Sequence, residues 1–161
     1  MYFPRVVEII EVGPRDGLQN EKTFVPTEQK IELIKQLHEA GFGRIETASF
    51  VHPKVVPQMA DAQRVTAFCN ELGITYIALT PNMKALERAI EANVPQVAVF
   101  VGASETFNQK NINRSITESL AECETLFKRA KEQLVLLPSI LSLCHFAQQI
   151  SRFDALFVYS H

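Results

Sequence analysis

Several chemically capable side chains lie between two glycines near the start of the chain, in the run Gly13-Pro14-Arg15-Asp16-Gly17-Leu18-Gln19-Asn20-Glu21. A guanidinium and a neighbouring carboxylate, as in Arg15 and Asp16, can take different roles in one reaction. The carboxylate binds a hard cation, while the guanidinium meets a substrate carboxylate or a developing oxyanion. The flanking glycines let the backbone approach a ligand closely. Spacing alone leaves two interpretations open, a ligand site or a surface ion pair in a turn.

A second group of candidates occupies the segment 44–48 and the residues directly after it. Glu46 is a carboxylate among small and apolar residues, and near a strand end that faces the site it can hold Arg15 in position. The alternative is an outward-facing polar side chain on an amphipathic strand. Ser49 can donate to a substrate oxygen, although serines in loops are common turn formers. We interpret His52, which precedes a proline, as a loop feature rather than a metal ligand.

The polar segments farther along the chain carry weaker signals. Capping of the following helix explains Thr80-Pro81-Asn82. The loop after Gly102 holds side chains that can touch a phosphate-bearing ligand, although a solvated loop is the simpler interpretation. These side chains are Ser104, Phe107, Asn108, Lys110, Asn111 and Asn113.

Composition and missing motifs exclude several functional classes. The 161 residues are 47% apolar and 21% charged, which predicts a globular protein. A net charge of −2 without a dense basic run argues against a nucleic-acid partner. The chain has no GxGxxG, Walker A, GxSxG or CxxC motif, so dinucleotide, nucleoside triphosphate and serine-hydrolase functions lack support. Polar residues interrupt every apolar run long enough to span a membrane.

Three widely separated cysteines indicate a reducing compartment. The first residues lack both a long apolar signal core and an Arg/Ser-rich transit segment. We therefore expect a cytoplasmic protein. Cys69 and Cys123 fall on apolar helix faces, where we expect them to be buried.

The elements that must position these residues alternate between strand and helix. Strands are predicted over 6–12, 44–48, 75–79 and 96–101. Helices are predicted from a cap at Thr27 to Gly41, over 62–72, across 86–90, and from a capping box at Ser115 and Glu118 to 130. Their apolar faces include Leu72 and Leu120. Four βα units in series imply parallel strands with right-handed crossovers, an order that fits a doubly wound sheet and a barrel alike.

The run 12–21 resembles the signature of the hydroxymethylglutaryl-CoA lyase family, one of the metal-dependent lyase and aldolase barrels. Four further blocks occur in family order within residues 6–133. They are Ile45-Glu46-Thr47-Ala48-Ser49-Phe50-Val51 with Pro53-Lys54, Val56-Pro57-Gln58-Met59-Ala60-Asp61, Leu79-Thr80-Pro81-Asn82, and Ser104-Glu105 with Asn111-Ile112-Asn113. The resemblance implies an α/β fold, an incomplete (β/α)8 TIM barrel holding the first four to five βα units.

The same resemblance implies cleavage of 3-hydroxy-3-methylglutaryl-CoA to acetyl-CoA and acetoacetate with Mg²⁺ or Mn²⁺. It makes Asp16 the metal-binding residue, Arg15 the catalytic arginine at the enolate-like thioester oxygen, and Glu46 the third member of the catalytic set. Gln19 and Ser49 are its weaker candidates for lining the substrate pocket. An acyl-CoA is the implied partner, and a homo-oligomer is left open. The alternatives are a related barrel aldolase or Claisen-type synthase acting on another 3-hydroxy acid, or a non-catalytic remnant.

The last 28 residues, 134–161, depart from this pattern. Only Arg152 and Asp154 are charged there, and 17 of the 28 are apolar. The segment 142–144 resembles the fifth strand of the family, whose members then supply a metal-binding His-x-His pair, a metal-binding Asn and a catalytic Cys. We expect residues 1–133 to be the N-terminal part of a barrel lyase and 134–161 to be an aberrant apolar tail, produced by a frameshift or altered in another way. We accordingly expect the chain to be inactive by itself.

Overall fold

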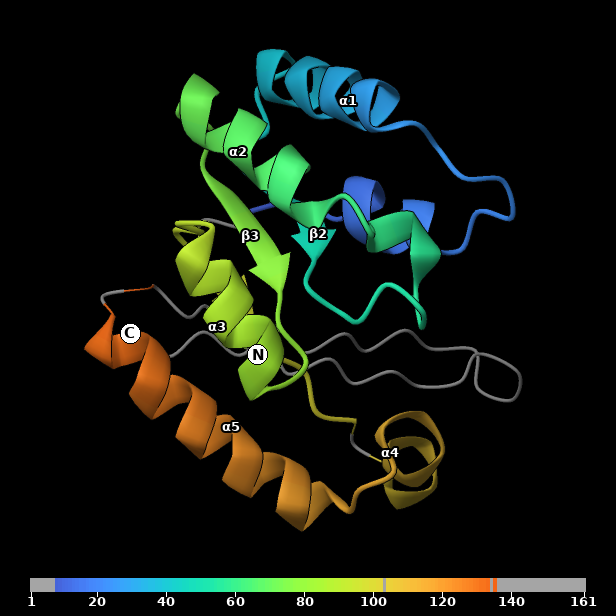
Figure 1. The fold of residues 1–161 in the computed structure, drawn as a ribbon, viewed down its shortest axis with the longest axis vertical. Coiled ribbons are helices and arrows are strands. Elements are labelled where there is room, and N and C mark those ends of the chain that lie inside the picture. The colour runs from blue at the N-terminus through green and yellow to red at the C-terminus, as the bar shows by residue number, and fades with distance from the viewer. Residues whose placement is uncertain (1–7, 103, 134, 136–161) are drawn as a thin grey trace, which may run out of the picture.

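The computed structural model describes residues 8–102, 104–133 and 135, and strands alternate with helices through most of this part of the chain (Figure 1). The strands are β1 (Ile10–Glu11), β2 (Arg44–Ser49), β3 (Tyr76–Leu79) and β4 (Val97–Ala98). The helices are α1 (Thr27–Glu39), α2 (Ala62–Leu72), α3 (Met83–Glu91), α4 (Glu105–Ile112) and α5 (Ile116–Glu132). Two short helical turns, η1 (Gly13–Gly17) and η2 (Pro57–Met59), lie between β1 and α1 and between β2 and α2.

The four strands form one parallel sheet in the order β1-β2-β3-β4. A doubly wound sheet reverses its strand order at a switch point, whereas a barrel adds each strand beside the previous one. Within the described residues no reversal occurs. The strand order therefore favours the barrel over the doubly wound sheet that the sequence pattern left open.

β2 contains one residue more than the stretch of β3 that it pairs with. The pairing advances from Glu46 opposite Ile77 to Ala48 opposite Ala78, so Thr47 is the extra residue. Such a bulge interrupts the alternation of side chains along a strand. Ile45 and Ala48, three residues apart, accordingly both belong to the hydrophobic core.

The core lies where the helices pack on the strands, and in Figure 1 α1, α2, α3 and α5 succeed one another from the top of the view to the bottom. Each of these helices contributes at least one apolar side chain that is no more than 2% exposed. These side chains are Ile34, Val65, Leu86 and Leu126. Cys69 and Cys123 are buried as predicted. Leu72 and Leu120 are about half exposed, so placing them on buried faces was wrong.

The helix starts follow local side-chain chemistry. The Asn82 side chain accepts from Ala85 N at 3.0 Å at the start of α3, and Ser115 with Glu118 forms the predicted capping box of α5. The predicted cap at Thr27 is wrong. Thr27 is the first residue of α1, and its hydroxyl donates instead to Asp61 Oδ2 at 2.8 Å.

The polar segment after β4 is the helix α4 rather than the expected solvated loop. Ser104 caps this helix by accepting from Phe107 N at 3.4 Å. Asn108 is fully buried, and its Oδ1 accepts from Gly102 N at 2.8 Å. A Cβ atom at Gly102 would lie 2.6 Å from that oxygen, so the contact requires glycine there. Burial of Asn108 is a tertiary effect that its polar sequence neighbourhood conceals.

The predicted strand 96–101 contracts to Val97–Ala98, and the strand predicted over 44–48 extends to Ser49. The predicted tail, 134–161, lies outside the described residues except for Val135, which packs against the core. Across the ranges that the structure describes, no helix combines the length and apolar character needed to cross a membrane.

Candidate active site

Arg15 lies between two carboxylates. In η1, directly after β1, its Nη1 donates to Asp16 Oδ1 at 2.7 Å, while its Nη2 donates to Oε2 of Glu46 in β2 at 2.8 Å. Glu46 is 1% exposed, Arg15 16% and Asp16 52%. The structure therefore brings together the three residues singled out in the sequence. Glu46 does not face outward, and Arg15 pairs with a buried carboxylate as well as with its exposed neighbour.

The tight turn of η1 sets the direction of Arg15. The amides of Arg15 and Asp16 both donate to the carbonyl oxygen of Val12, at 3.1 and 2.7 Å. Gly13 N donates to Glu11 Oε1 at 2.6 Å, and a Cβ atom on Gly13 would lie 2.8 Å from that oxygen. A side chain at position 13 would therefore displace the Glu11 carboxylate from its contact with Gly13 N.

Asp16 is oriented by a second donor. Gln19 Nε2 donates to Asp16 Oδ1 at 2.8 Å, so this oxygen accepts from both Arg15 and Gln19. The Asn20 side chain also donates to the backbone oxygen of Asp16 at 2.8 Å. These contacts fix a half-exposed carboxylate beside the guanidinium. They place Gln19 beside Asp16, and its role in lining the substrate pocket stays a prediction.

Burial dominates the electrostatics of Glu46. It raises the pKa of the Glu46 carboxyl, and the hydrogen bond and charge of Arg15 oppose this rise without cancelling it. Within the described part of the chain, Glu46 Oε1 and Arg15 Nε are buried without a hydrogen-bond partner. The Arg15–Glu46 pair therefore has one buried acceptor and one buried donor that the hydrogen bond between the two residues does not use.

Ser49 is near the carboxyl end of β2 but serves the backbone. It is 1% exposed, its hydroxyl donates to Leu79 O at 3.5 Å, and it accepts from Val51 N at 3.3 Å. A role for Ser49 in lining the substrate pocket stays a prediction.

The described site offers fewer donors than a divalent ion needs. Mg²⁺ or Mn²⁺ takes about six ligands, mostly oxygens. Among residues 8–102, 104–133 and 135, no three His, Cys, Asp or Glu side chains form a group that could hold a metal. The described residues therefore do not build a complete metal site. Asp16 offers a single carboxylate toward one.

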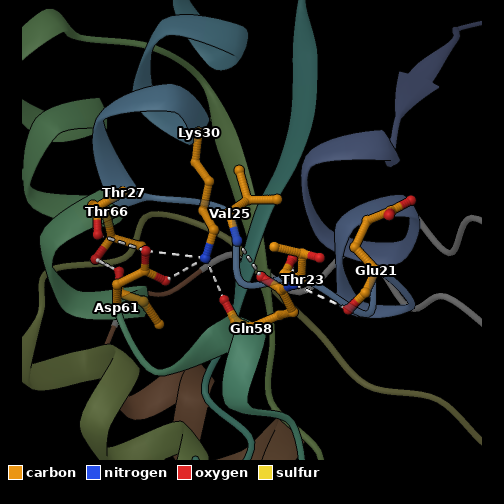
Figure 2. Close-up of polar contacts among 9 residues, drawn as sticks. Glu21, Thr23, Val25, Thr27, Lys30, Gln58, Asp61 and Thr66 are labelled. Carbon is orange, nitrogen blue, oxygen red and sulfur yellow. Dashed lines mark hydrogen bonds and ion pairs between the residues drawn. The ribbon is translucent and has the colours of Figure 1, made fainter.

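Sequence reasoning missed a buried polar cluster next to this site, formed by Lys30, Gln58 and Asp61 (Figure 2). One signal was available. Lys30 occupies the same helical face as Ile34, at a spacing of four residues, and a lysine on an apolar face needs a buried partner.

Consecutive parallel strands, each followed by a helix, and polar side chains gathered at the first two strands define a barrel of the (β/α) class. A sequence model of the HMGL-like family matches residues 6–157, and the chain belongs to that family.

Relatives with known names support the same assignment. The chain is 52% identical over 130 residues to the mitochondrial hydroxymethylglutaryl-CoA lyase of Bos taurus, covering 80% of this chain and 40% of that protein. The crystal structure of hydroxymethylglutaryl-CoA lyase from Pseudomonas aeruginosa matches with a TM-score of 0.80 and 46% identity, covering 86% of this chain and 47% of that one.

A third relative was solved with ligands. An HMG-CoA lyase from Acinetobacter baumannii in complex with coenzyme A and 3-methylmalate matches with a TM-score of 0.75 and 36% identity, over 85% of this chain and 45% of that one. The chain therefore spans less than half the length of each of these three relatives.

Proposed function

We propose that this chain supplies the first part of the active site of a carbon–carbon lyase that cleaves 3-hydroxy-3-methylglutaryl-CoA to acetyl-CoA and acetoacetate. The observation that carries the proposal is Arg15 held between the half-exposed Asp16 and the buried Glu46. Support also comes from membership of the HMGL-like family and from relatives named as lyases of this substrate.

In this reaction the tertiary hydroxyl of the substrate loses its proton and becomes the ketone of acetoacetate. The carbon–carbon bond beside it breaks, and its electron pair passes to the other fragment as the enolate of acetyl-CoA, which is then protonated on carbon. We assign Arg15 to the enolate oxygen, because an oriented guanidinium stabilises charge that develops in the transition state. Glu46 has a positioning role, since it holds the Nη2 edge of Arg15 from a buried strand.

We further propose Asp16 as one ligand of a divalent ion, with Gln19 orienting its carboxylate. When bound, such an ion polarises substrate oxygens. The complete site would need donors beyond those that the described residues bring together. Ser49 is proposed to line the pocket from β2.

The acyl-CoA class of substrate is supported by the Acinetobacter baumannii relative solved with coenzyme A. A homo-oligomer and a cytoplasmic location stay predictions. The Bos taurus relative is named as a mitochondrial protein, so its name does not support the cytoplasmic location.

A chimera tests the proposal. Residues 8–133 of this chain would replace the matching part of the Pseudomonas aeruginosa lyase, and formation of acetyl-CoA and acetoacetate would be measured. We expect turnover, and a fall in kcat of about a hundredfold or more for Arg15→Gln, the range for loss of one stabilising donor.

The matched control is Arg64→Gln, because Arg64 is 66% exposed and pairs only at the surface with Glu28 at 2.6 Å. A folded chimera that acts on another 3-hydroxy acid instead would support a related aldolase or synthase. A folded chimera without turnover, or with turnover insensitive to Arg15→Gln, would reject the proposed function.

A further inference from the structure

Gln58 connects the loop after β2 with the segment 21–25, which continues from the Arg15–Asp16 turn. Its Nε2 donates to Glu21 O at 3.0 Å and to Thr23 O at 2.6 Å, and its Oε1 accepts from Val25 N at 3.1 Å. Gln58 is only 5% exposed. One buried amide thus satisfies three backbone groups of an otherwise mostly exposed segment (Figure 2).

The Lys30–Asp61 ion pair holds the backbone of Gln58 in place. Lys30 Nζ lies 2.9 and 3.0 Å from the two carboxylate oxygens of Asp61 and also donates to the carbonyl oxygen of Gln58. Lys30 is 3% exposed and Asp61 12%. Burying such a pair is costly unless every donor is used. The three donors of the Lys30 ammonium match these three oxygens, which fixes the short turn η2 against α1.

The held segment leads directly back to the candidate site. Glu21 N donates to Leu18 O at 3.0 Å, and Asn20 N donates to Gly17 O at 3.3 Å. The side chains of Gln19 and Asn20 both donate to Asp16. Residues 16–21 therefore form one hydrogen-bonded turn, and its last carbonyl, Glu21 O, accepts from Gln58 Nε2.

We propose that Gln58 is a positioning residue for Asp16 and Arg15, acting through the segment 21–25, and that Lys30 and Asp61 fix Gln58 for this purpose. The assignment to catalysis rests on the proposed lyase function. Two independent contacts then hold the first loop, Arg15 to Glu46 of β2 at its start and Gln58 of η2 to the segment 21–25 at its end.

Amide hydrogen exchange of the 161-residue chain tests the proposal without requiring turnover. Gln58→Met keeps the volume and removes the three hydrogen bonds. Gln58→Glu keeps the acceptor for Val25 but presents an oxygen to the Glu21 and Thr23 carbonyls. We expect both variants to lower the protection factors of Asn20, Glu21 and Val25 about tenfold, the effect of losing a net hydrogen bond or more. Leu86 in α3 and Ser119 in α5 serve as reference amides, and we expect their protection to be unchanged.

Gln63→Met is the matched control, because Gln63 is an exposed glutamine in α2. Loss of protection at Val25 alone would overturn the proposal, since Gln58 would then act only on its direct partner. Equal loss at Leu86 and Ser119 in both variants would also overturn it, since Gln58 would then support the whole fold. In the active chimera, Gln58→Met is expected to lower kcat, whereas the control Gln63→Met leaves kcat unchanged. A chimera without turnover would reject the proposed function and leave the exchange result standing.

Discussion

Arg15 Nη2 lies 2.8 Å from Glu46 Oε2, which joins the turn after the first strand to the second strand across 31 positions of sequence. The buried carboxylate orients one edge of the guanidinium, while the other edge meets Asp16 near solvent. A single side chain thus couples the part of the site that a substrate can reach to the interior of the sheet.

Arg15→Lys tests whether the residue at position 15 must donate hydrogen bonds to Asp16 and Glu46 at the same time. A lysine ammonium keeps the charge but lacks the planar fork that meets both carboxylates at fixed angles. In the chimera we expect kcat for cleavage of 3-hydroxy-3-methylglutaryl-CoA to fall about a hundredfold or more. Steady-state kinetics check this, with the exposed Arg64→Lys as the control. Full activity of the Arg15→Lys chimera would show that charge alone suffices.

Glu46→Gln tests the balance between burial and ion pairing. Burial raises the pKa of Glu46 above its ordinary value of 4.5 in the folded chain. The stability contributed by Glu46 is therefore fully present below that value and is lost as the pH rises through the folded pKa. We expect the free energy of unfolding of the natural chain, relative to Glu46→Gln, to fall between about pH 4 and about pH 8. Urea unfolding at both pH values measures it, and a relative stability that grows with pH would mean that attraction to Arg15 outweighs burial.

Removal of metal ions is expected to leave the lyase activity of the isolated 161-residue chain unchanged. We expect this chain to have no lyase activity even with excess Mg²⁺ or Mn²⁺. The physical reason is that the described residues offer Asp16 without a group of further ligands. Acetyl-CoA formation by the purified chain, with and without added ions, measures this. Turnover that Asp16→Ala abolishes would contradict the prediction.

Leu86→Ala tests the core between α3 and the sheet. Leu86 is fully buried, so we expect the free energy of unfolding to fall by about 2–5 kcal/mol. Leu120→Ala is the matched control, because Leu120 is 48% exposed and its loss should cost no more than about 0.5 kcal/mol. Chemical denaturation measures both values. Similar losses in the two variants would mean that the packing around α3 is looser than the structure shows.

Local chemistry allowed much of the fold to be predicted. Gly73 adopts a φ of 65° after α2, Asn82 caps α3, and the capping box starts α5, all of which depend on neighbours within a few residues. The helix α4 could not be predicted in this way. Its buried side chain is Asn108, which accepts from Gly102 N before the helix and donates to Ser119 Oγ in α5 at 3.5 Å. A polar residue therefore occupies a buried position where an apolar residue would have indicated a helix.

The candidate site, like the fold, could be predicted from the sequence only in part. The adjacent Arg15 and Asp16 are visible in sequence as a pair, but the burial of Glu46 and its contact with Arg15 depend on the pairing of β1 with β2. The sequence left open whether Glu46 holds Arg15 or faces outward, and the resemblance to a known family placed the two residues in one catalytic set without giving their contact. Gln58 gave no signal of its own, since its three partners lie 33 to 37 positions earlier in the chain.

The extra residue in β2 decides which side chains of this strand share a face. Glu46 precedes Thr47 and Ser49 follows it, so the two site residues lie on opposite sides of the bulge. Glu46 is opposite Ile77 and Ser49 is opposite Leu79, two residues farther along β3, so the bulge puts Glu46 and Ser49 on one face although they are three positions apart. A shift of β2 by one residue that straightened the bulge and kept Thr47 would turn Ser49 to the other face, so Ser49 shares the face of Glu46 because of the bulge and not because of its spacing in the sequence.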